Sequence, residues 1–182
     1  SFEKGSVEAT KNILEIKNVR ANNDRNLIAL KDISLDVKGG EILGIAGVDG
    51  NGQSELAEVL TGLRKTLGGK IILDGKDITK LSTQAIRNLG VAYTPEDRMN
   101  IGLILEYSVS ENLVLDKFSS SPFSKGLFMN QSEIDKYAKK LVSDFGIRTP
   151  SVDVPAKQLS GGNLQKIVLA RELSSNPKLI IV

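Results

Sequence analysis

The pattern of apolar and polar positions divides the chain into an early part rich in predicted strands and a later part rich in predicted helices. Apolar and polar side chains alternate over residues 13–19 and again over 27–37, which predicts two half-exposed strands. Residues 41–47 form a nearly continuous apolar run, which is typical of a buried parallel strand. Residues 68–78 read as a strand, an Asp-Gly turn and a second strand.

Helical spacing replaces this alternation further along the chain. A short helix is predicted over 81–90, with Ser82 or Thr83 as its cap. Residues 130–146 predict an amphipathic helix, capped by Asn130 with Glu133 and stopped by Gly146. A Gly-Gly turn opens another helix after Leu159, and residues 178–182 begin a predicted buried strand. The whole pattern indicates an α/β fold, in which an antiparallel β subdomain and a helical subdomain are attached to a phosphate-binding core.

Composition and charge exclude several classes of protein. The chain has 182 residues, and its net charge of +2 is too small to suggest binding to nucleic acid or a membrane surface. It contains neither cysteine nor histidine, which excludes disulfides, thiolate metal sites and imidazole catalysis. No apolar run approaches the roughly 18 to 20 residues that span a bilayer. This composition is typical of a cytosolic protein.

The stretch GIAGVDGNGQSELAEVLTG (residues 44–62) has the pattern of a phosphate-binding loop between a predicted strand and a predicted helix. The template G-x-x-x-x-G-K-[ST] maps onto Gly47, Gly52, Gln53 and Ser54. Its glycines permit a turn that points N–H groups inward, and the following helix adds its positive dipole end, so the backbone predicts an anion site. Ser54 keeps the hydroxyl that would bind Mg²⁺, but Gln53 stands where the template has lysine.

The missing lysine removes a charge that the phosphates of a nucleotide would meet. Two unit charges about 5 Å apart at an effective dielectric near 20 attract each other by roughly 3 kcal/mol, which corresponds to about a hundredfold in affinity. Asp49 and Glu55 add two carboxylates near the same place, and Glu55 stabilises the first helical turn without a ligand. Taken alone, this stretch is equally compatible with a Gly-rich turn that binds no ligand.

Residues 159–166 (LSGGNLQK) closely resemble the signature of the ATP-binding cassette (ABC) proteins. The order of features also resembles that family: a strand, a phosphate loop, a PED turn at the place of the Q-loop, a helical segment, the signature and an apolar strand. SGG alone could be a flexible turn, but the loop and the signature together are specific. The resemblance covers nearly the whole chain from Ile13 onward, and it implies a P-loop NTPase core of ABC type.

The segments GVDGNGQSEL, TPEDR, SVSENLVL and IRTPS with LSGGNLQK are similar to the second cassette of the tandem-cassette ATPases of simple-sugar importers. The Gln-Ser form of the loop is most similar to their nucleoside-importing relatives. The resemblance implies that residues 1–12 are a linker between cassettes. It implies that residues 13–182 are a partial nucleotide-binding domain, with a helical subdomain at about 99–158, and that the chain stops just before the Walker B acidic residue.

The resemblance also implies the roles of single residues in binding ATP. The phosphates would be held by the loop residues Gly47, Asp49, Gly50, Asn51, Gly52, Gln53, Ser54 and Glu55. Glu96 falls where the Q-loop of the family has glutamine, which makes Glu96 the candidate catalytic residue and, with Ser54, the candidate Mg²⁺ ligand. The position of the aromatic residue that stacks on adenine in many cassettes falls at Asn22 or Asn23, so the stacking partner is missing.

The signature itself is intact in this resemblance. Its residues are Ser160, Gly161, Gly162 and Asn163. The helix that they open would direct its positive dipole end at the γ-phosphate bound on the opposite cassette. Asn163 replaces the commoner glutamine, as is usual in the sugar-importer branch.

The function that the resemblance implies is coupling of ATP binding and hydrolysis to the import of a simple sugar or nucleoside. The degenerate loop would bind nucleotide weakly or without turnover, and the signature would complete the site of the first cassette. The implied partners are that cassette, in the same polypeptide or as a dimer mate, the membrane permease subunits and indirectly a substrate-binding lipoprotein, with no nucleic acid. The implied location is the cytoplasmic face of the cell membrane.

Two other classes of protein remain as alternatives. A non-membrane ABC ATPase of DNA repair or translation typically carries an intact loop and basic insertions, neither of which is present. A small nucleotide kinase or GTPase shares the core, but the signature and the lack of a basic lid argue against it.

Overall fold

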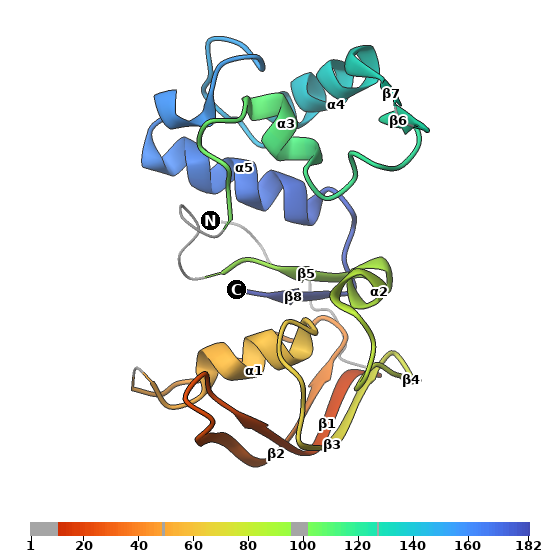
Figure 1. Ribbon diagram of the computed structural model, residues 1–182, viewed down its shortest axis with the longest axis vertical. Coiled ribbons are helices and arrows are strands. Elements are labelled where there is room, and N and C mark those ends of the chain that lie inside the picture. The colour runs from red at the N-terminus through yellow and green to blue at the C-terminus, as the bar shows by residue number, and fades with distance from the viewer. Residues whose placement is uncertain (1–10, 49, 96–101, 127) are drawn as a thin grey trace. The chain divides into compact units, whose positions relative to one another are not determined.

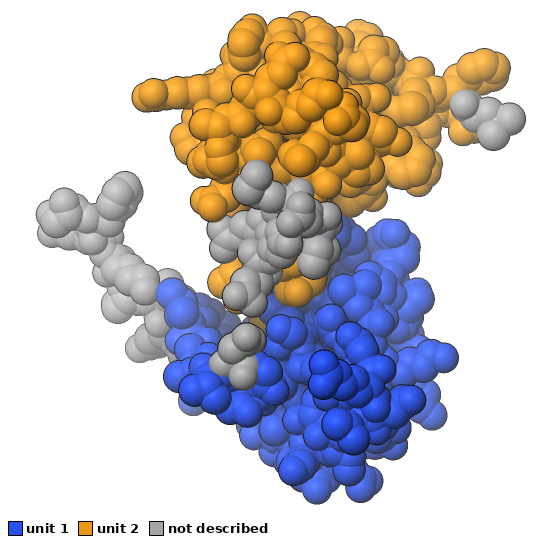
Figure 2. All heavy atoms as spheres, turned by 60° about the vertical axis from the view of Figure 1, so that its left-hand side comes forward, with its two compact units in different colours: residues 1–91, 181 blue, residues 92–180, 182 orange. Residues whose placement is uncertain are grey.

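The computed structural model describes residues 11–48, 50–95, 102–126 and 128–182, and the chain forms two compact units (Figure 1). Figure 2 colours these units: the first contains residues 1–91 and 181, and the second contains residues 92–180 and 182. Within the described ranges, no helix is long and apolar enough to cross a membrane. The predicted phosphate loop belongs to the first unit and the predicted signature to the second.

An antiparallel sheet is the frame of the first unit. Its order is β2-β1-β3-β4, and its strands are β1 (Asn12–Asn22), β2 (Ile28–Lys38), β3 (Gly68–Leu73) and β4 (Lys76–Asp77). All neighbouring pairs are antiparallel, which confirms the predicted antiparallel β subdomain. β3 and β4 are joined through Asp74 and Gly75, whose φ angles of 47° and 81° suit the left-handed pair of a two-residue hairpin turn.

Helix α1 (Gln53–Leu60) lies against β1 and β2 of this sheet (Figure 1). It buries three apolar side chains on one face, Leu56, Val59 and Leu60. β1 contributes Leu14 and Ile16 to the buried core, because alternate residues of a strand point to the same face. This packing anchors the helix whose first turn carries the predicted phosphate loop.

Among the described residues, the second unit is built mainly from three α-helices, which Figure 1 labels. They are α3 (Val109–Val114), α4 (Gln131–Asp144) and α5 (Gly161–Leu173), and each contacts the other two. The apolar face predicted over 130–146 is buried, since Ile134 and Ala138 are both 0% exposed. The strands β6 (Ser124–Lys125) and β7 (Phe128–Met129) pair in a hairpin between α3 and α4, and a single 3₁₀ turn, η1 (Ala156–Gln158), precedes α5.

Polar side chains cap the start of three helices. The capping residues are Ser82 for α2 (Thr83–Asn88), Ser108 for α3 and Asn130 for α4. Each side-chain oxygen accepts a hydrogen bond from the backbone N–H three residues later, at 3.3, 3.2 and 3.4 Å respectively. Such a cap stabilises a helix by about 1 kcal/mol. The predicted caps at Ser82 and Asn130 are confirmed.

One prediction of a buried strand is wrong, and a second is confirmed as a strand but not as a buried one. Residues 41–47 are not a strand, and their apolar side chains are exposed, Ile42 by 82% and Ile45 by 53%. β8 (Leu179–Ile181) does form, but among the described strands it pairs only with β5 (Val91–Tyr93), and Ile180 is 48% exposed. A buried strand needs hydrogen-bonding neighbours and covered faces, which an apolar run does not supply by itself.

Candidate functional site

The predicted phosphate loop turns into α1 through two glycines in the left-handed region. The φ angle is 80° at Gly50 and 100° at Gly52, and the exposed Asn51 lies between them. A Cβ atom on Gly52 would lie 3.1 Å from the carbonyl oxygen of Ala29 and 3.0 Å from Cδ2 of Leu30, both on β2. The backbone angle and this close approach to the sheet together require glycine at position 52.

The start of α1 presents backbone donors that no described side chain caps. Leu56 N donates the first intrahelical hydrogen bond, to Gly52 O at 2.9 Å, so the N–H groups of Gln53, Ser54 and Glu55 come before it. These donors and the positive end of the helix dipole suit an anion. Glu55 opposes this effect in part, because it places a carboxylate in the same turn.

Gln53, at the lysine position of the template, lies across the loop. Its Nε2 atom donates a hydrogen bond to the carbonyl oxygen of Val48 at 3.3 Å. The carboxamide is so close to Gly47 that a Cβ atom at position 47 would overlap it. Gln53 therefore contributes a neutral donor that is engaged with the loop's own backbone, and it contributes no positive charge.

Two predicted site residues, Asp49 and Glu96, lie outside the described residues. In the part of the chain that is described, no group of three or more His, Cys, Asp or Glu side chains gathers as a metal site. Mg²⁺ at a nucleotide usually takes only one or two protein oxygens, together with phosphate oxygens and water. Ser54 is exposed at the start of α1, and its hydroxyl fits such a role. Ser54 therefore suits a Mg²⁺ that arrives with phosphate.

The position expected for an adenine-stacking residue lies in the hairpin between β1 and β2. Asn23 Oδ1 accepts hydrogen bonds from the N–H groups of Arg25 and Leu27, at 3.0 and 3.1 Å, and so closes the hairpin on itself. The carbonyl oxygen of Asn22 accepts a hydrogen bond from Arg64 Nη1 at 2.8 Å. Both asparagines thus serve the hairpin, and neither offers an aromatic face to a base.

Arg64, which the motifs did not single out, fixes this hairpin to α1. Its guanidinium pairs with the carboxylate of Asp24 at 2.6 Å and with that of Glu58, on α1, at 2.7 Å. The hydrogen bond to Asp24, followed by that to Glu58, raises the pKa of Arg64 above its ordinary value. The charge of Arg64 is therefore engaged with Asp24 in the hairpin and with Glu58 in the C-terminal half of α1, and it does not replace the lysine missing from the loop.

The signature forms the first turn of α5. The carbonyl oxygen of Ser160 accepts the first intrahelical hydrogen bonds, from Asn163 N at 2.9 Å and Leu164 N at 3.0 Å, so the N–H groups of Gly161 and Gly162 come before them. A Cβ atom on either glycine would meet nothing within 4 Å. Packing within the described chain therefore does not require glycine at these two positions.

Asn163 ties this turn to the loop that follows α4. Its Nδ2 donates to Ser160 Oγ at 3.0 Å, and its Oδ1 accepts from the backbone N–H of Arg148 at 2.9 Å. Lys166 makes a second tie, from Nζ to the carbonyl oxygen of Gly146 at 2.7 Å. The motifs did not indicate Arg148, and since it contributes only a backbone group, its sequence offers no signal for this role.

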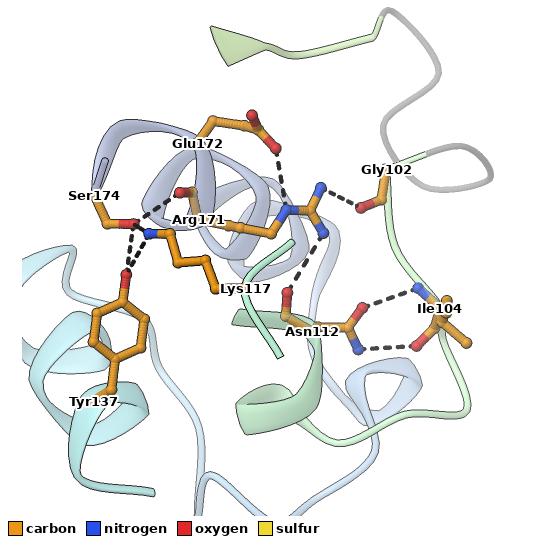
Figure 3. A network of polar contacts seen from close by, with 8 residues as sticks. All are labelled: Gly102, Ile104, Asn112, Lys117, Tyr137, Arg171, Glu172 and Ser174. Carbon is orange, nitrogen blue, oxygen red and sulfur yellow. Dashed lines mark hydrogen bonds and ion pairs between the residues drawn. The ribbon is translucent and has the colours of Figure 1, made fainter. Parts of the chain in front are cut away.

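A buried polar network in the second unit holds the chain that follows residue 101 (Figure 3). Arg171, on α5, donates to the carbonyl oxygen of Gly102 at 2.9 Å and to that of Asn112 at 3.4 Å. The side chain of Asn112, on α3, donates to the carbonyl oxygen of Ile104 and accepts from its N–H, both at 2.9 Å. Two buried polar residues on different helices thus hold this segment through its backbone.

Solved structures share this fold. A nucleotide-free ATP-binding cassette from an ABC transporter matches 93% of this chain and 68% of its own chain, with a TM-score of 0.76 at 27% identity. The dimeric post-hydrolysis state of the ATP-binding cassette MJ0796, bound to ADP and Pi, matches 92% of this chain and 72% of its own, with a TM-score of 0.73 at 25% identity. These likenesses confirm the predicted ABC ATPase cassette fold, α/β with an antiparallel β subdomain and a helical part.

The family follows from the sequence match. A family model described as ABC transporter matches residues 30–182, and the chain belongs to this family.

Named relatives are import proteins. The chain is 41% identical over 179 residues to the guanosine import ATP-binding protein NupO of Bacillus subtilis, covering 98% of this chain and 35% of NupO. It is 42% identical over 180 residues to the nucleoside import ATP-binding protein NupA of Lactococcus lactis, covering 99% of this chain and 36% of NupA. It is 35% identical to the ribose import ATP-binding protein RbsA 2 of Rhizobium johnstonii, covering 100% of this chain and 34% of that protein.

The chain therefore spans about a third of the length of these relatives. These three relatives are named as import proteins, and none of the three is named as a DNA-repair or translation ATPase.

Proposed function

We propose that the chain is a nucleotide-binding cassette of an ABC importer and couples ATP binding and hydrolysis to uptake of a nucleoside or simple sugar. The observation that carries this proposal is the presence, in one chain of the family, of two helix starts with exposed backbone donors. One is the phosphate loop at α1 and the other the signature turn at α5. The substrate class comes from the relatives named for guanosine, nucleoside and ribose import.

The two motifs are unequal, which supports an asymmetric pair of cassettes. The signature keeps its serine and both glycines, and nothing in the described chain fills the space beside the glycines. The loop has a neutral Gln53 engaged with Val48 O, in place of a lysine. In this proposal the signature completes the nucleotide site of a first cassette, whereas the loop of this chain forms a second site that binds weakly or does not turn over.

The proposed ligands are ATP and Mg²⁺, and backbone and side-chain groups of the loop would hold them. Backbone N–H groups from Gly50 to Glu55 would hold phosphate oxygens, and the hydroxyl of Ser54 would meet the metal ion. Glu96 would act at the Q-loop position, as a further Mg²⁺ ligand and a residue that orients water. When bound, Mg²⁺ neutralises charge on the phosphates.

The proposed assembly follows the relatives' role as import proteins. The first cassette would lie in the same polypeptide or in a dimer mate, and the dimeric cassette bound to ADP and Pi offers a precedent for paired cassettes. Membrane permease subunits would hold the pair at the cytoplasmic face of the membrane, and a substrate-binding lipoprotein would deliver the substrate. Residues 1–12 would be the linker to the first cassette, and residues 13–182 part of the second, with its helical subdomain at about 99–158.

The test compares the two motifs in the full-length protein assembled with its permease subunits in liposomes. Gly162→Asp places a carboxylate beside the signature amides, and its side chain has room, because a Cβ atom there meets nothing within 4 Å. We expect this variant to lower ATP hydrolysis by about a hundredfold or more. Gln53→Ala removes the side chain from the degenerate loop, and we expect hydrolysis to stay within about threefold of the parent protein.

Opposite results would overturn the proposal. If Gln53→Ala abolishes hydrolysis, the loop of this chain serves the main catalytic site. If Gly162→Asp leaves hydrolysis unchanged in a correctly assembled complex, the signature of this chain completes no working site.

A further inference from the structure

Ser160 has the backbone of a capping serine, but its side chain does not cap its helix. Its φ and ψ of −67° and 154° match those of Ser82 (−70° and 156°) and Ser108 (−62° and 165°). The other two hydroxyl oxygens accept a hydrogen bond from a backbone N–H, whereas α5 has no side-chain cap of this kind among the described residues. The Oγ atom of Ser160 accepts instead from Nδ2 of Asn163, at 3.0 Å.

The direction of these hydrogen bonds is fixed by chemistry. The backbone N–H of Arg148 is a donor, so the atom of Asn163 that faces it at 2.9 Å is the amide oxygen. The amide nitrogen, which only donates, therefore faces Ser160. Because the hydroxyl of Ser160 accepts that bond, its own hydrogen is left free to donate elsewhere.

We propose that Asn163 is a positioning residue, which holds the hydroxyl of Ser160 as a hydrogen-bond donor to the terminal phosphate of the nucleotide on the partner cassette. The inference rests on the proposed function of the signature. The hydroxyl hydrogen of Ser160 and the N–H groups of Gly161 and Gly162 then form a set of donors beside an open face. In this arrangement the hydroxyl of Ser160 does not cap its helix, and it serves instead as a hydrogen-bond donor to an anion.

A purely structural role for Asn163, as a tie between α5 and the loop after α4, is the competing explanation. That tie exists already through Lys166, whose Nζ donates to the carbonyl oxygen of Gly146 at 2.7 Å. Lys166 has no hydrogen bond to Ser160 among those of the described residues. Lys166→Met is therefore a matched control that loosens the same loop and leaves the Asn163–Ser160 pair in place.

The experiment measures ATP hydrolysis by the full-length protein with its permease subunits, in Asn163→Asp, Ser160→Ala and the double variant. Asn163→Asp keeps the size of the side chain and the acceptor for Arg148 N–H, but it turns the partner of Ser160 from donor to acceptor. The hydroxyl of Ser160 would then donate to the carboxylate, and its hydrogen would no longer face the ligand. We expect kcat to fall by about a hundredfold, with KM for ATP within about threefold of the parent. We expect Ser160→Ala to have the same effect.

The double variant separates positioning from added charge or misfolding. If Asn163 acts through Ser160, then Asn163→Asp in the Ser160→Ala background lowers kcat by no more than about threefold further. Asn163→Gln, which keeps a donor and an acceptor, is expected to retain activity within about tenfold of the parent, and Lys166→Met within about threefold.

Each remaining outcome rejects a different statement. If Asn163→Asp costs about as much in the Ser160→Ala background as in the parent, or if it has no effect while Ser160→Ala is impaired, the positioning role is wrong and the proposed function stands. If Ser160→Ala itself leaves hydrolysis unchanged, the proposed function of the signature fails, and the inference fails with it.

Discussion

Arg171 Nε donates to Glu172 Oε1 at 3.1 Å, in an ion pair between sequence neighbours whose side chains are only 8% and 2% exposed (Figure 3). Burial deprives both charges of hydration, so such a pair persists only with further hydrogen bonds around it. Arg171 makes them to the carbonyl oxygens of Gly102 and Asn112. The C-terminal part of α5, the helix that begins with the signature, is in this way bonded to the chain after residue 101 and to α3.

Replacing the arginine of this pair is expected to destabilise the protein strongly. Arg171→Met removes the guanidinium from beside the buried carboxylate of Glu172, and losing one partner of a buried pair costs about 3 to 5 kcal/mol. Urea unfolding followed by circular dichroism measures the loss. Arg148→Met is the matched control, since Arg148 is exposed and its known bond comes from the backbone, and it is expected to change stability by less than about 0.5 kcal/mol.

A second substitution tests whether the charge of Glu172 causes the loss. Adding Glu172→Gln to Arg171→Met removes the carboxylate, so we expect the double variant to recover part of the stability. If adding Glu172→Gln lowers the stability of Arg171→Met further, by as much as an independent second substitution would, this explanation is contradicted.

Asn112 is expected to be sensitive to the loss of its donors. It is 0% exposed, and its Nδ2 atom donates to the carbonyl oxygens of Ile104, Tyr107 and Ser108 at 2.9, 3.3 and 3.0 Å. Asn112→Asp has the same shape, but it replaces these donors with acceptors and buries a carboxylate, which we expect to cost about 2 to 4 kcal/mol. Chemical unfolding measures the difference.

Asn88→Asp provides the same chemical change at an exposed site. Asn88 lies on the surface of α2, and its Oδ1 atom accepts from Gln84 Nε2 at 3.1 Å, a bond that a carboxylate can also accept. This control is expected to change stability by less than about 0.5 kcal/mol. If Asn88→Asp and Asn112→Asp lower the free energy of unfolding equally, the buried hydrogen bonds of Asn112 contribute little to stability.

Local patterns predicted the elements that local physics determines. The alternation of 13–19, the turn at Asp74 and Gly75 and the cap at Asn130 are each specified by a few neighbouring residues, and the structure confirms them. The apolar run 41–47 predicts a buried strand that does not form, because burial of a strand depends on partners distant in the sequence.

The residues of the candidate site also divide into those that a local sequence pattern predicts and those whose role depends on partners distant in the sequence. The phosphate loop and the signature were found because their glycines and hydroxyls recur at fixed spacing. The role of Asn163 could not be found in this way, because it depends on the backbone N–H of Arg148, which comes close only in the folded unit. Arg171 and Asn112 likewise meet through backbone carbonyl oxygens, and any residue type carries those.

Asp77 is expected to make stability depend on pH in the acidic range. A hydrogen bond from Thr79 Oγ1 at 2.6 Å is the main cause that lowers the pKa of Asp77 below its ordinary value, and the N–H of Thr79 and the ammonium of Lys70 act in the same direction. Because the folded state favours the ionised carboxylate, this contribution is present above the unfolded-state pKa, and it is lost as pH falls through the folded-state pKa.

The Asp77→Asn variant measures this contribution directly. We expect its thermal midpoint to lie below that of the parent near neutral pH, and the gap to close as the pH is lowered towards about 2.5. Asp135→Asn is a suitable control, because Asp135 accepts a hydrogen bond from neutral Gln131 at 2.8 Å on α4. A gap for Asp77→Asn that widens on acidification would mean that the sign of the pKa shift is wrong.

Gln53→Lys is expected to restore affinity for Mg-ATP in the phosphate loop. The lysine would bring a positive charge to the place where Gln53 now contacts Val48 O, and a charge pair about 5 Å apart is worth roughly 3 kcal/mol at an effective dielectric near 20. Titration calorimetry on a full-length protein whose first cassette cannot bind nucleotide should then show an affinity about a hundredfold above that of the parent.

Gln53→Met separates this charge from the loss of the Val48 contact, because it removes the carboxamide and adds no charge, and we expect it to bind no better than the parent. If Gln53→Met gains as much as Gln53→Lys, the carboxamide obstructs the loop and the missing charge is not the cause. If the parent itself binds Mg-ATP in the micromolar range, the backbone cradle is sufficient, and the loop is a second working nucleotide site.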